Sequence, residues 1–299
     1  MKKCKGVIPP IVTPFKQDGS INEASLEKLV KFLSGKVHGL FVCGSYGSGP
    51  LMNIEERMKV AEIISKNRKN YTQFIVHVGS TNIRDSVRLA KHAETVGAEK
   101  IASIVPYYYH HNKDSIKLFF DKLLHSVNIP VYVYNNPKFT GINISVEMLQ
   151  ELAELGISGV KDSSFDIMLL ADFMRKIKKE DFDVVLGTEA MFLPASALGT
   201  QAFIPGLGNA FPEICVDLFN AAINHEMEKA LRIQKKVNKL RDIMYLAKST
   251  IVAVYTMLKI RGICDSFPRE PFTTLSKNET NLMRKELKRI GILEELKKI

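Results

Sequence analysis

Short apolar stretches recur along the first two thirds of the chain, and they limit the folds that it can adopt. Each is followed by a segment whose apolar residues have helical spacing. The stretches are apolar throughout rather than alternating with polar residues, which is typical of strands buried on both faces of a parallel sheet. We therefore expect eight strand–helix units, with strands at Val7–Val12, Leu40–Cys43, Phe74–Val78, Ile101–Val105, Val131–Tyr134, Gly159–Lys161, Val184–Gly187 and Ala202–Ile204.

Three of the intervening segments carry residues that favour helix ends. Asn22, Ser145 and the Asn53/Glu56 pair stand where an N-cap or a capping box is expected, because their side chains can pair with free backbone N–H groups. Gly35 and Gly156 follow two of these segments and are expected to end the helices.

Eight strand–helix repeats are the pattern of an α/β protein with a closed (β/α)8 TIM barrel. A doubly wound open sheet, the main alternative, would use fewer units and carry a glycine-rich fingerprint after its first strand. Here the first stretch leads into Thr13-Pro14-Phe15, which lacks that fingerprint. Beyond about residue 210 only helical spacing remains. We expect a barrel over residues 1–215 and a C-terminal helical region over residues 216–299.

The composition excludes several classes of partner. With 45% hydrophobic and 25% charged residues, the 299-residue chain is typical of a globular protein, and its longest apolar stretch, around Ile251–Leu258, is too short to span a membrane. The net charge of +10 comes from lysines and arginines interleaved with acidic residues, without a nucleic-acid-binding motif. We expect small-molecule partners, no nucleic acid and no membrane.

The four cysteines and seven histidines show no spacing typical of a metal site. We therefore expect reduced cysteine thiols, a cytoplasmic protein, and neither a metal nor a cofactor. The lysines near the start are not followed by an apolar segment, so no signal peptide is expected.

Lys161 ends one of the buried stretches, and the carboxyl ends of the strands form the active site of a barrel. A desolvated lysine amine has a lowered pKa and can attack carbonyl carbon atoms. Alternatively, the side chain extends to solvent or pairs with Asp162. Tyr134 ends the preceding strand and favours catalysis, since a phenol beside an amine can transfer protons. The alternative for Tyr134 is a tyrosine at the barrel rim with a satisfied hydroxyl.

The loop Gly44–Gly49 follows the second strand and matches neither common phosphate-binding motif. Its backbone N–H groups and the Ser45 hydroxyl are suited to holding a carboxylate. A plain tight loop is the alternative.

Several motifs together resemble the dihydrodipicolinate synthase / N-acetylneuraminate lyase family, along essentially the whole chain. Each motif is weak alone, but their order and spacing are specific. They are Gly6-Val7 with Thr13-Pro14-Phe15, Gly44-Ser45-x-Gly47, Pro106-Tyr107-Tyr108, Tyr134-Asn135-x-Pro137-x-x-Thr140-Gly141, Gly159-Val160-Lys161-Asp162, Gly187 and Ala210-Phe211-Pro212-Glu213.

The resemblance implies a class I aldolase or lyase in which Lys161 forms a Schiff base with the carbonyl of pyruvate. It implies that Tyr134 is the acid/base, and that Ser45 serves in the hydroxyl relay and helps to bind the pyruvate carboxylate. Tyr108 looks like the tyrosine that one subunit lends to its neighbour, which implies a homo-oligomer, a dimer or a tetramer. Gly187 and Ile204 match positions that line the Schiff-base pocket.

Two departures from the family pattern concern substrate binding. Tyr46 stands where the family usually has threonine, and its bulk is expected to narrow the site. Phe139 stands where dihydrodipicolinate synthases carry an arginine that recognises the aldehyde's carboxylate. A phenyl ring offers no hydrogen-bond donor for that purpose.

The segments Gly47–Pro50 and Phe267–Pro271 look closer to archaeal 2-keto-3-deoxygluconate aldolases. We therefore expect an aldolase that reversibly cleaves a 2-oxo-3-deoxy sugar acid to pyruvate and an aldehyde. Dihydrodipicolinate synthase, N-acetylneuraminate lyase and a sugar-acid dehydratase are open alternatives, because the family shares the fold and the lysine. A non-catalytic ligand-binding barrel is the alternative of a different class, and retention of both Lys161 and Tyr134 speaks against it.

Overall fold

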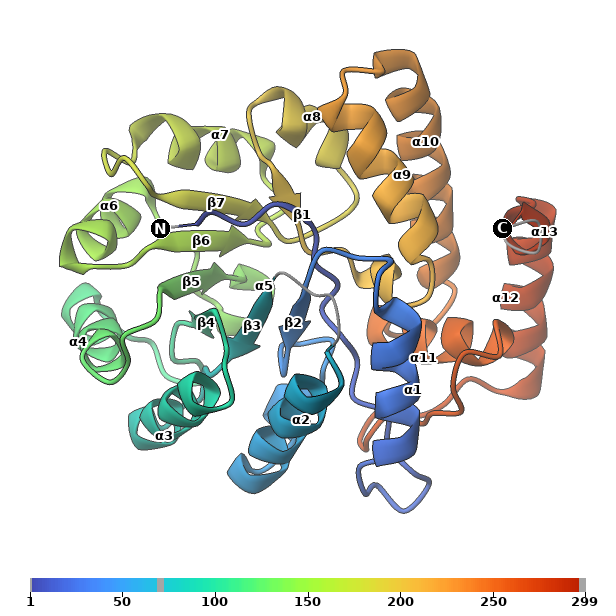
Figure 1. The fold of residues 1–299 in the computed structure, drawn as a ribbon, viewed down its shortest axis with the longest axis horizontal. Coiled ribbons are helices and arrows are strands. Elements are labelled where there is room, and N and C mark those ends of the chain that lie inside the picture. The colour runs from blue at the N-terminus through green and yellow to red at the C-terminus, as the bar shows by residue number, and fades with distance from the viewer. Residues whose placement is uncertain (1, 69–72, 296–299) are drawn as a thin grey trace.

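Eight parallel strands form one curled sheet, which confirms the expected (β/α)8 fold (Figure 1). The computed structural model describes residues 2–68 and 73–295. The strand order is β1-β8-β7-β6-β5-β4-β3-β2. The strands are β1 (Gly6–Val7), β2 (Leu40–Val42), β3 (Phe74–His77), β4 (Lys100–Ile104), β5 (Val131–Asn135), β6 (Gly159–Asp162), β7 (Asp183–Leu186) and β8 (Ala202–Phe203).

The first strand is much shorter than the stretch expected from the sequence. Pro9 and Pro10 follow β1, and proline has no backbone N–H to donate to a neighbouring strand. The seam between β1 and β2 is therefore held by a few contacts only. The Phe41 N–H donates to the Pro9 carbonyl at 3.0 Å, and the Ile11 N–H donates to the Phe41 carbonyl at 3.0 Å.

Helices surround the sheet, and the three caps expected from the sequence are present. The Asn22 and Ser145 side chains accept hydrogen bonds from backbone N–H groups, and Asn53 and Glu56 form a reciprocal capping box. Up to β8 the helices are α1 (Glu23–Leu33), α2 (Ile54–Asn67), α3 (Ile83–Thr95), α4 (Lys113–Leu124), α5 (Pro137–Thr140), α6 (Val146–Leu155), α7 (Ile167–Lys176) and α8 (Phe192–Ala197), with a 3-10 turn, η1 (Gly49–Leu51).

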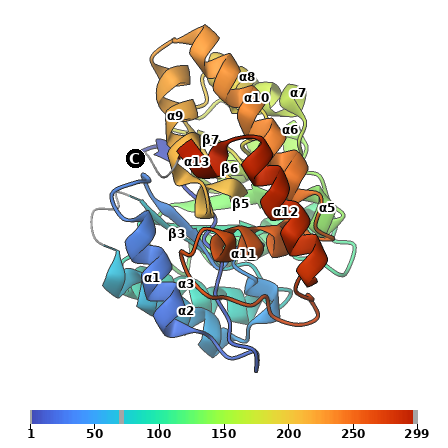
Figure 2. The ribbon, with the colours of Figure 1, turned by 90° about the vertical axis from the view of Figure 1, so that its right-hand side faces the viewer.

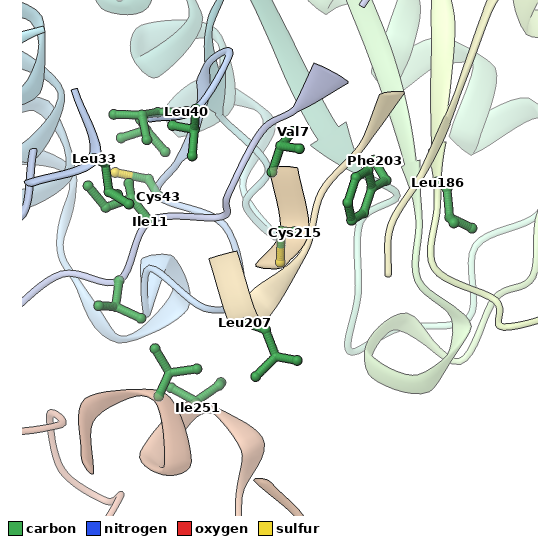
Figure 3. Close-up of a cluster of buried hydrophobic side chains, with 14 of the residues drawn as sticks. Val7, Ile11, Leu33, Leu40, Cys43, Leu186, Phe203, Leu207, Cys215 and Ile251 are labelled. Atoms are coloured by element: carbon green, nitrogen blue, oxygen red, sulfur yellow. The ribbon is translucent and has the colours of Figure 1, made fainter. Parts of the chain in front are cut away.

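The alternation of side chains along the strands produces two apolar clusters. The larger cluster lies between the sheet and the helices (Figure 3), where Val7 and Phe203 of the strands and Cys215 of α9 (Pro212–Ile223) belong to one buried group. The smaller cluster fills the barrel interior and includes Phe41, Tyr134 and Ile204. The interior of the barrel is thus a packed core with aromatic side chains near its carboxyl end.

Helices continue after the last strand, as the sequence predicts. They are α9, α10 (Met227–Met244), α11 (Thr250–Ile260), α12 (Lys277–Arg289) and α13 (Ile292–Glu295). Helix α11 packs on η2 (Gly206–Asn209), the turn after β8, and α12 packs along α10 (Figure 2). Residue 215 lies inside α9, so a division of the chain there stays a proposal, and residues 296–299 of the expected helical region lie outside the described residues. None of the described helices is long and apolar enough to cross a membrane.

Candidate active site

Lys161 lies inside the barrel beside Tyr134. The two residues are paired in the register of β5 and β6, so both side chains project toward the interior. Lys161 is buried, and its amine lies 3.8 Å from the ring centroids of both Phe41 and Tyr134. Burial lowers the pKa of Lys161, and the neighbouring Tyr134 opposes this shift. The amine therefore lies in an environment that favours its neutral, nucleophilic form.

Asp162, the alternative partner of Lys161, has other contacts. Its carboxylate accepts hydrogen bonds from the Asn135 amide at 2.8 Å and from the Ser164 hydroxyl at 2.7 Å. Adjacent strand residues point to opposite faces, which places Asp162 on the outer side of β6. Because Lys161 is only 4% exposed, it does not extend to solvent either.

The Tyr134 phenol is the centre of a group of hydrogen bonds. The Asn136 side-chain amide donates to it at 2.8 Å, and the side chains of Ser45 and Ser163 also hydrogen-bond to it. Burial by itself would raise the pKa of Tyr134, but the Lys161 charge and these three hydrogen bonds outweigh burial and lower it. Sequence reasoning missed Asn136 and Ser163, although both follow strand ends that it had identified.

His77 of β3 is a buried residue of the site that sequence reasoning also missed. Its ring lies edge-on to that of Tyr134, with centroids 5.8 Å apart. The Ile104 N–H donates to Nε2 at 3.3 Å, so Nδ1 carries the proton and donates to the Cys43 carbonyl at 3.2 Å. Burial, followed by the charges of Arg57 and Lys161, holds the pKa of His77 well below its ordinary value. His77 is thus a neutral spacer that connects three strand ends.

Arg57 of α2 supports the same strand ends from outside the barrel. It is buried, and its guanidinium donates to the carbonyls of His77 at 2.7 Å and Gly79 at 3.0 Å. An arginine on a helix is usually solvated, so the helical pattern alone gave no sign of this contact.

A cavity of about 260 Å³ opens beside the polar group. Its polar wall includes Ser45, Ser48 and His77, and its apolar wall includes Phe139, Ile251 and Phe272. None of the described residues that line it is a lysine, arginine, aspartate or glutamate. Ile251 and Phe272 come from the C-terminal helical region, more than 200 positions after Ser45 in the printed sequence. Sequence reasoning did not identify them because no local pattern marks a residue that closes a distant cavity.

Of the other site residues expected from the sequence, Ile204 and Gly187 lie near the polar group, whereas Tyr46 and Tyr108 do not line the cavity. Ile204 belongs to the interior cluster with Tyr134, and Gly187 lies so close to Ser163 that a Cβ there would collide with its hydroxyl. Tyr46 is not among the residues that line the cavity, because its ring packs on the backbone of Gly206. Tyr108 is 86% exposed and points into solvent from a left-handed backbone conformation with φ 82°.

None of the cysteines forms a disulfide. All four are free and buried. Among the described residues, no three His, Cys, Asp or Glu side chains gather in a way that could hold a metal ion.

We predict that Lys161→Met stabilises the fold at neutral pH. The folded-state pKa of Lys161 lies below its ordinary value of 10.5, so the unfolded chain binds the proton more tightly. The wild-type protein therefore loses stability as pH falls through this window, by about 1.4 kcal/mol for each unit of the shift. Urea unfolding should show a more stable variant at pH 7 and a difference that shrinks as pH approaches 10.5. Lys31→Met, on the exposed side of α1, is the control; equal stability of Lys161→Met and wild type at pH 7 would contradict the prediction.

Comparisons with known proteins agree with this geometry. Residues 3–290 match the model of the Dihydrodipicolinate synthetase family. A 4-hydroxy-tetrahydrodipicolinate synthase of Methanopyrus kandleri is 30% identical, over 97% of this chain and 98% of the relative. An N-acetylneuraminate lyase of Pasteurella multocida is also 30% identical, over 96% of this chain and 98% of the relative.

The solved structures show the same relationship. The dihydrodipicolinate synthase of Aquifex aeolicus superposes with a TM-score of 0.89 at 28% identity, covering 96% of this chain and 98% of that one. The similarity therefore extends over the barrel and over the C-terminal helices. The chain belongs to the dihydrodipicolinate synthetase family of class I aldolases and lyases, which form a Schiff base with pyruvate.

Proposed function

We propose that this protein reversibly cleaves a 2-oxo-3-deoxy sugar acid to pyruvate and an aldehyde through a Schiff base on Lys161. The observation that carries the proposal is a buried amine in contact with the Tyr134 ring, beside a cavity with no charged wall residue. A buried amine with a lowered pKa attacks a carbonyl at neutral pH more readily than an exposed lysine.

The chemistry follows from the two side chains. The neutral Lys161 amine adds to the 2-oxo carbon, and loss of water gives a protonated imine, with Tyr134 supplying and accepting the protons. The Tyr134 phenolate then takes the proton of the substrate's C4 hydroxyl. The C3–C4 bond breaks, its electron pair moves toward the imine nitrogen, and the aldehyde leaves. Protonation of the resulting enamine at C3 and hydrolysis release pyruvate and regenerate the amine.

Ser45 is proposed to extend this proton path and to help bind the pyruvate carboxylate. Its side chain hydrogen-bonds to the Tyr134 phenol and also lines the cavity. Gly187 and Ile204, at the ends of β7 and β8, are proposed to form the wall behind the Schiff base. The lack of a Cβ at Gly187 leaves space for the Ser163 hydroxyl.

Tyr108 is proposed to complete the relay of a second copy of this chain. Tyr108 and Tyr109 are 86% and 70% exposed and lie edge-to-face with centroids 5.0 Å apart. Two adjacent exposed aromatic rings are typical of residues that become buried on association. We therefore propose a homo-oligomer, a dimer or a tetramer. The four free cysteines suit a reducing compartment, and we place the enzyme in the cytoplasm.

The absence of a cationic wall residue supports an uncharged aldehyde partner. Aspartate semialdehyde, the partner in dihydrodipicolinate synthesis, would bring a second carboxylate, which needs a donor such as a guanidinium. Phe139 lines the cavity and offers none, and the neighbouring Lys138 is exposed and is not a lining residue. The relatives named as synthases and as N-acetylneuraminate lyases are equally similar to this chain, so identity alone does not favour either substrate. A sugar-acid dehydratase would use the same lysine.

We predict that borohydride reduction in the presence of pyruvate attaches a three-carbon unit to Lys161. Peptide mass spectrometry should find this unit in the wild-type protein and not in Lys161→Met. Lys179→Met is a matched control, because burial also lowers the pKa of Lys179 at a distant position. This control should label like the wild type. An unmodified Lys161 in the wild type, or equal labelling of Lys161→Met, would end the proposal.

We predict that Tyr134→Phe keeps the fold and slows turnover by about 10²–10⁴-fold, the usual effect of a positioned general acid/base. A tyrosine that only packs would give the opposite pattern, with altered stability and nearly normal turnover. Melting temperature and turnover measured on the same preparation distinguish the two results.

We predict that the protein cleaves 2-keto-3-deoxygluconate with a higher kcat/KM than it condenses pyruvate with aspartate semialdehyde. Phe139→Arg should narrow or reverse this preference, because it supplies the missing cation, and Phe139→Leu is the uncharged control. A faster semialdehyde reaction in the wild type would refute the substrate proposal and leave the Schiff-base chemistry standing.

A further inference from the structure

Tyr46 does not line the cavity, and its side chain reaches residues of the C-terminal helices. Its phenol hydrogen-bonds to the side chain of Thr250, the first residue of α11, and it lies near Glu189 and Arg241. Its ring covers Gly206 so closely that a Cβ at position 206 would lie 2.5 Å from the Tyr46 Cζ atom. Tyr46 therefore connects the loop that bears Ser45 to the end of β8 and to α11.

Glu189, just beyond β7, is held by two side chains of α10. It is 1% exposed, and its carboxylate pairs with the Arg241 guanidinium. Gln234, two helical turns before Arg241, donates to the Glu189 carbonyl at 2.9 Å. Arg241 also donates to the Thr188 hydroxyl at 3.2 Å. The pair with Arg241 gives Tyr46 a fixed, negatively charged neighbour.

The same loop is anchored on its other side by backbone contacts. The Thr13 hydroxyl donates to the Gly47 carbonyl at 2.8 Å, and the Ser48 N–H donates to the Ser45 carbonyl at 3.1 Å. These contacts fix the main chain after Ser45. The main described side-chain anchor next to Ser45 is Tyr46, which contacts Gly206 after β8 and Thr250 of α11 and lies near Glu189 after β7 and Arg241 of α10.

We propose that Tyr46 is a positioning residue, anchored by Thr250 and the Glu189–Arg241 pair, that holds the Ser45 hydroxyl against the Tyr134 phenol. The C-terminal helices thereby take part in setting the acid/base group although they contribute no reacting atom. This inference rests on the proposed function for its effect on turnover, but its structural content concerns the free enzyme.

A change in the contact with Ser45 should shift the pKa of Tyr134 in a known direction. The Ser45 hydrogen bond is one of the contacts that lower the pKa of Tyr134, so weakening it raises that pKa. The other titratable groups that face Tyr134 are Lys161 of β6, His77 of β3 and Tyr46 itself. His77 stays neutral and Lys161 is unchanged in the variants below. Burial raises the pKa of Tyr46, so its phenol carries no charge while Tyr134 titrates, and a shift reports the contact with Ser45.

The test measures the ionisation of Tyr134 in the free enzyme by tyrosinate absorbance, with Tyr134→Phe identifying its signal. Tyr46→Phe should move this ionisation to higher pH, and so should Ser45→Ala. The double variant should move it no further than Ser45→Ala alone, because Tyr46 acts through Ser45. In turnover, Tyr46→Phe should lower kcat/KM by about 5- to 30-fold, the range that corresponds to one or two kcal/mol, and should shift the same limb of the pH profile.

A second variant disturbs Tyr46 without changing it. Gly206→Ala should displace the ring and produce the same shift, whereas in a Tyr46→Thr background, which has no ring to displace, Gly206→Ala should add nothing. A Tyr46→Phe protein with an unshifted Tyr134 ionisation overturns the inference, as does a full additional shift in the double variant with Ser45→Ala. A lowered melting temperature without a shift of the Tyr134 ionisation also overturns the inference, because it indicates a purely structural role for Tyr46. Failure of the borohydride reaction would instead refute the proposed function, since the titration needs no substrate.

Discussion

The site depends on burying one amine inside a barrel that is otherwise apolar. A buried ammonium group loses its hydration, and this loss is the largest cause of the lowered pKa of Lys161. The rings of Phe41 and Tyr134 contact the amine at 3.8 Å and partly offset the cost of its charged form. The balance suits a Schiff-base lysine, which must be neutral to attack a carbonyl and charged as the imine.

The residues around Lys161 provide hydrogen bonds within the otherwise apolar interior of the barrel. Tyr134 receives hydrogen bonds from three side chains, while His77 is neutral and has both ring nitrogens occupied by the backbone of neighbouring strands. His77 therefore separates the cation of Arg57 from the amine of Lys161 without competing as an acid or base. In this arrangement Tyr134 is the titratable group best placed to exchange protons with the amine.

The C-terminal helices complete the site from outside the barrel. Ile251 and Phe272 close the cavity with apolar surface, and Arg241 and Gln234 of α10 hold Glu189 in place behind Tyr46. Such a division is common in enzymes built on barrels, because the strands supply rigid positions for the chemistry and added segments shape the entrance. The similarity to relatives covers these helices as well as the strands.

The sequence by itself determined the repeat of strands and helices, the helix caps, and the adjacency of Lys161 and Tyr134. These features follow from local rules, since apolar runs, capping side chains and the order of parallel neighbours are all written in nearby residues. The early end of β1 at Val7 also has a local cause, since Pro9 and Pro10 follow it in the sequence. Only the tertiary structure decided that His77 and Arg57 support the site, that Tyr46 turns toward Gly206, and that Ile251 and Phe272 close the cavity. Each of these depends on which distant side chains share a buried space, and no periodicity along the chain encodes that choice.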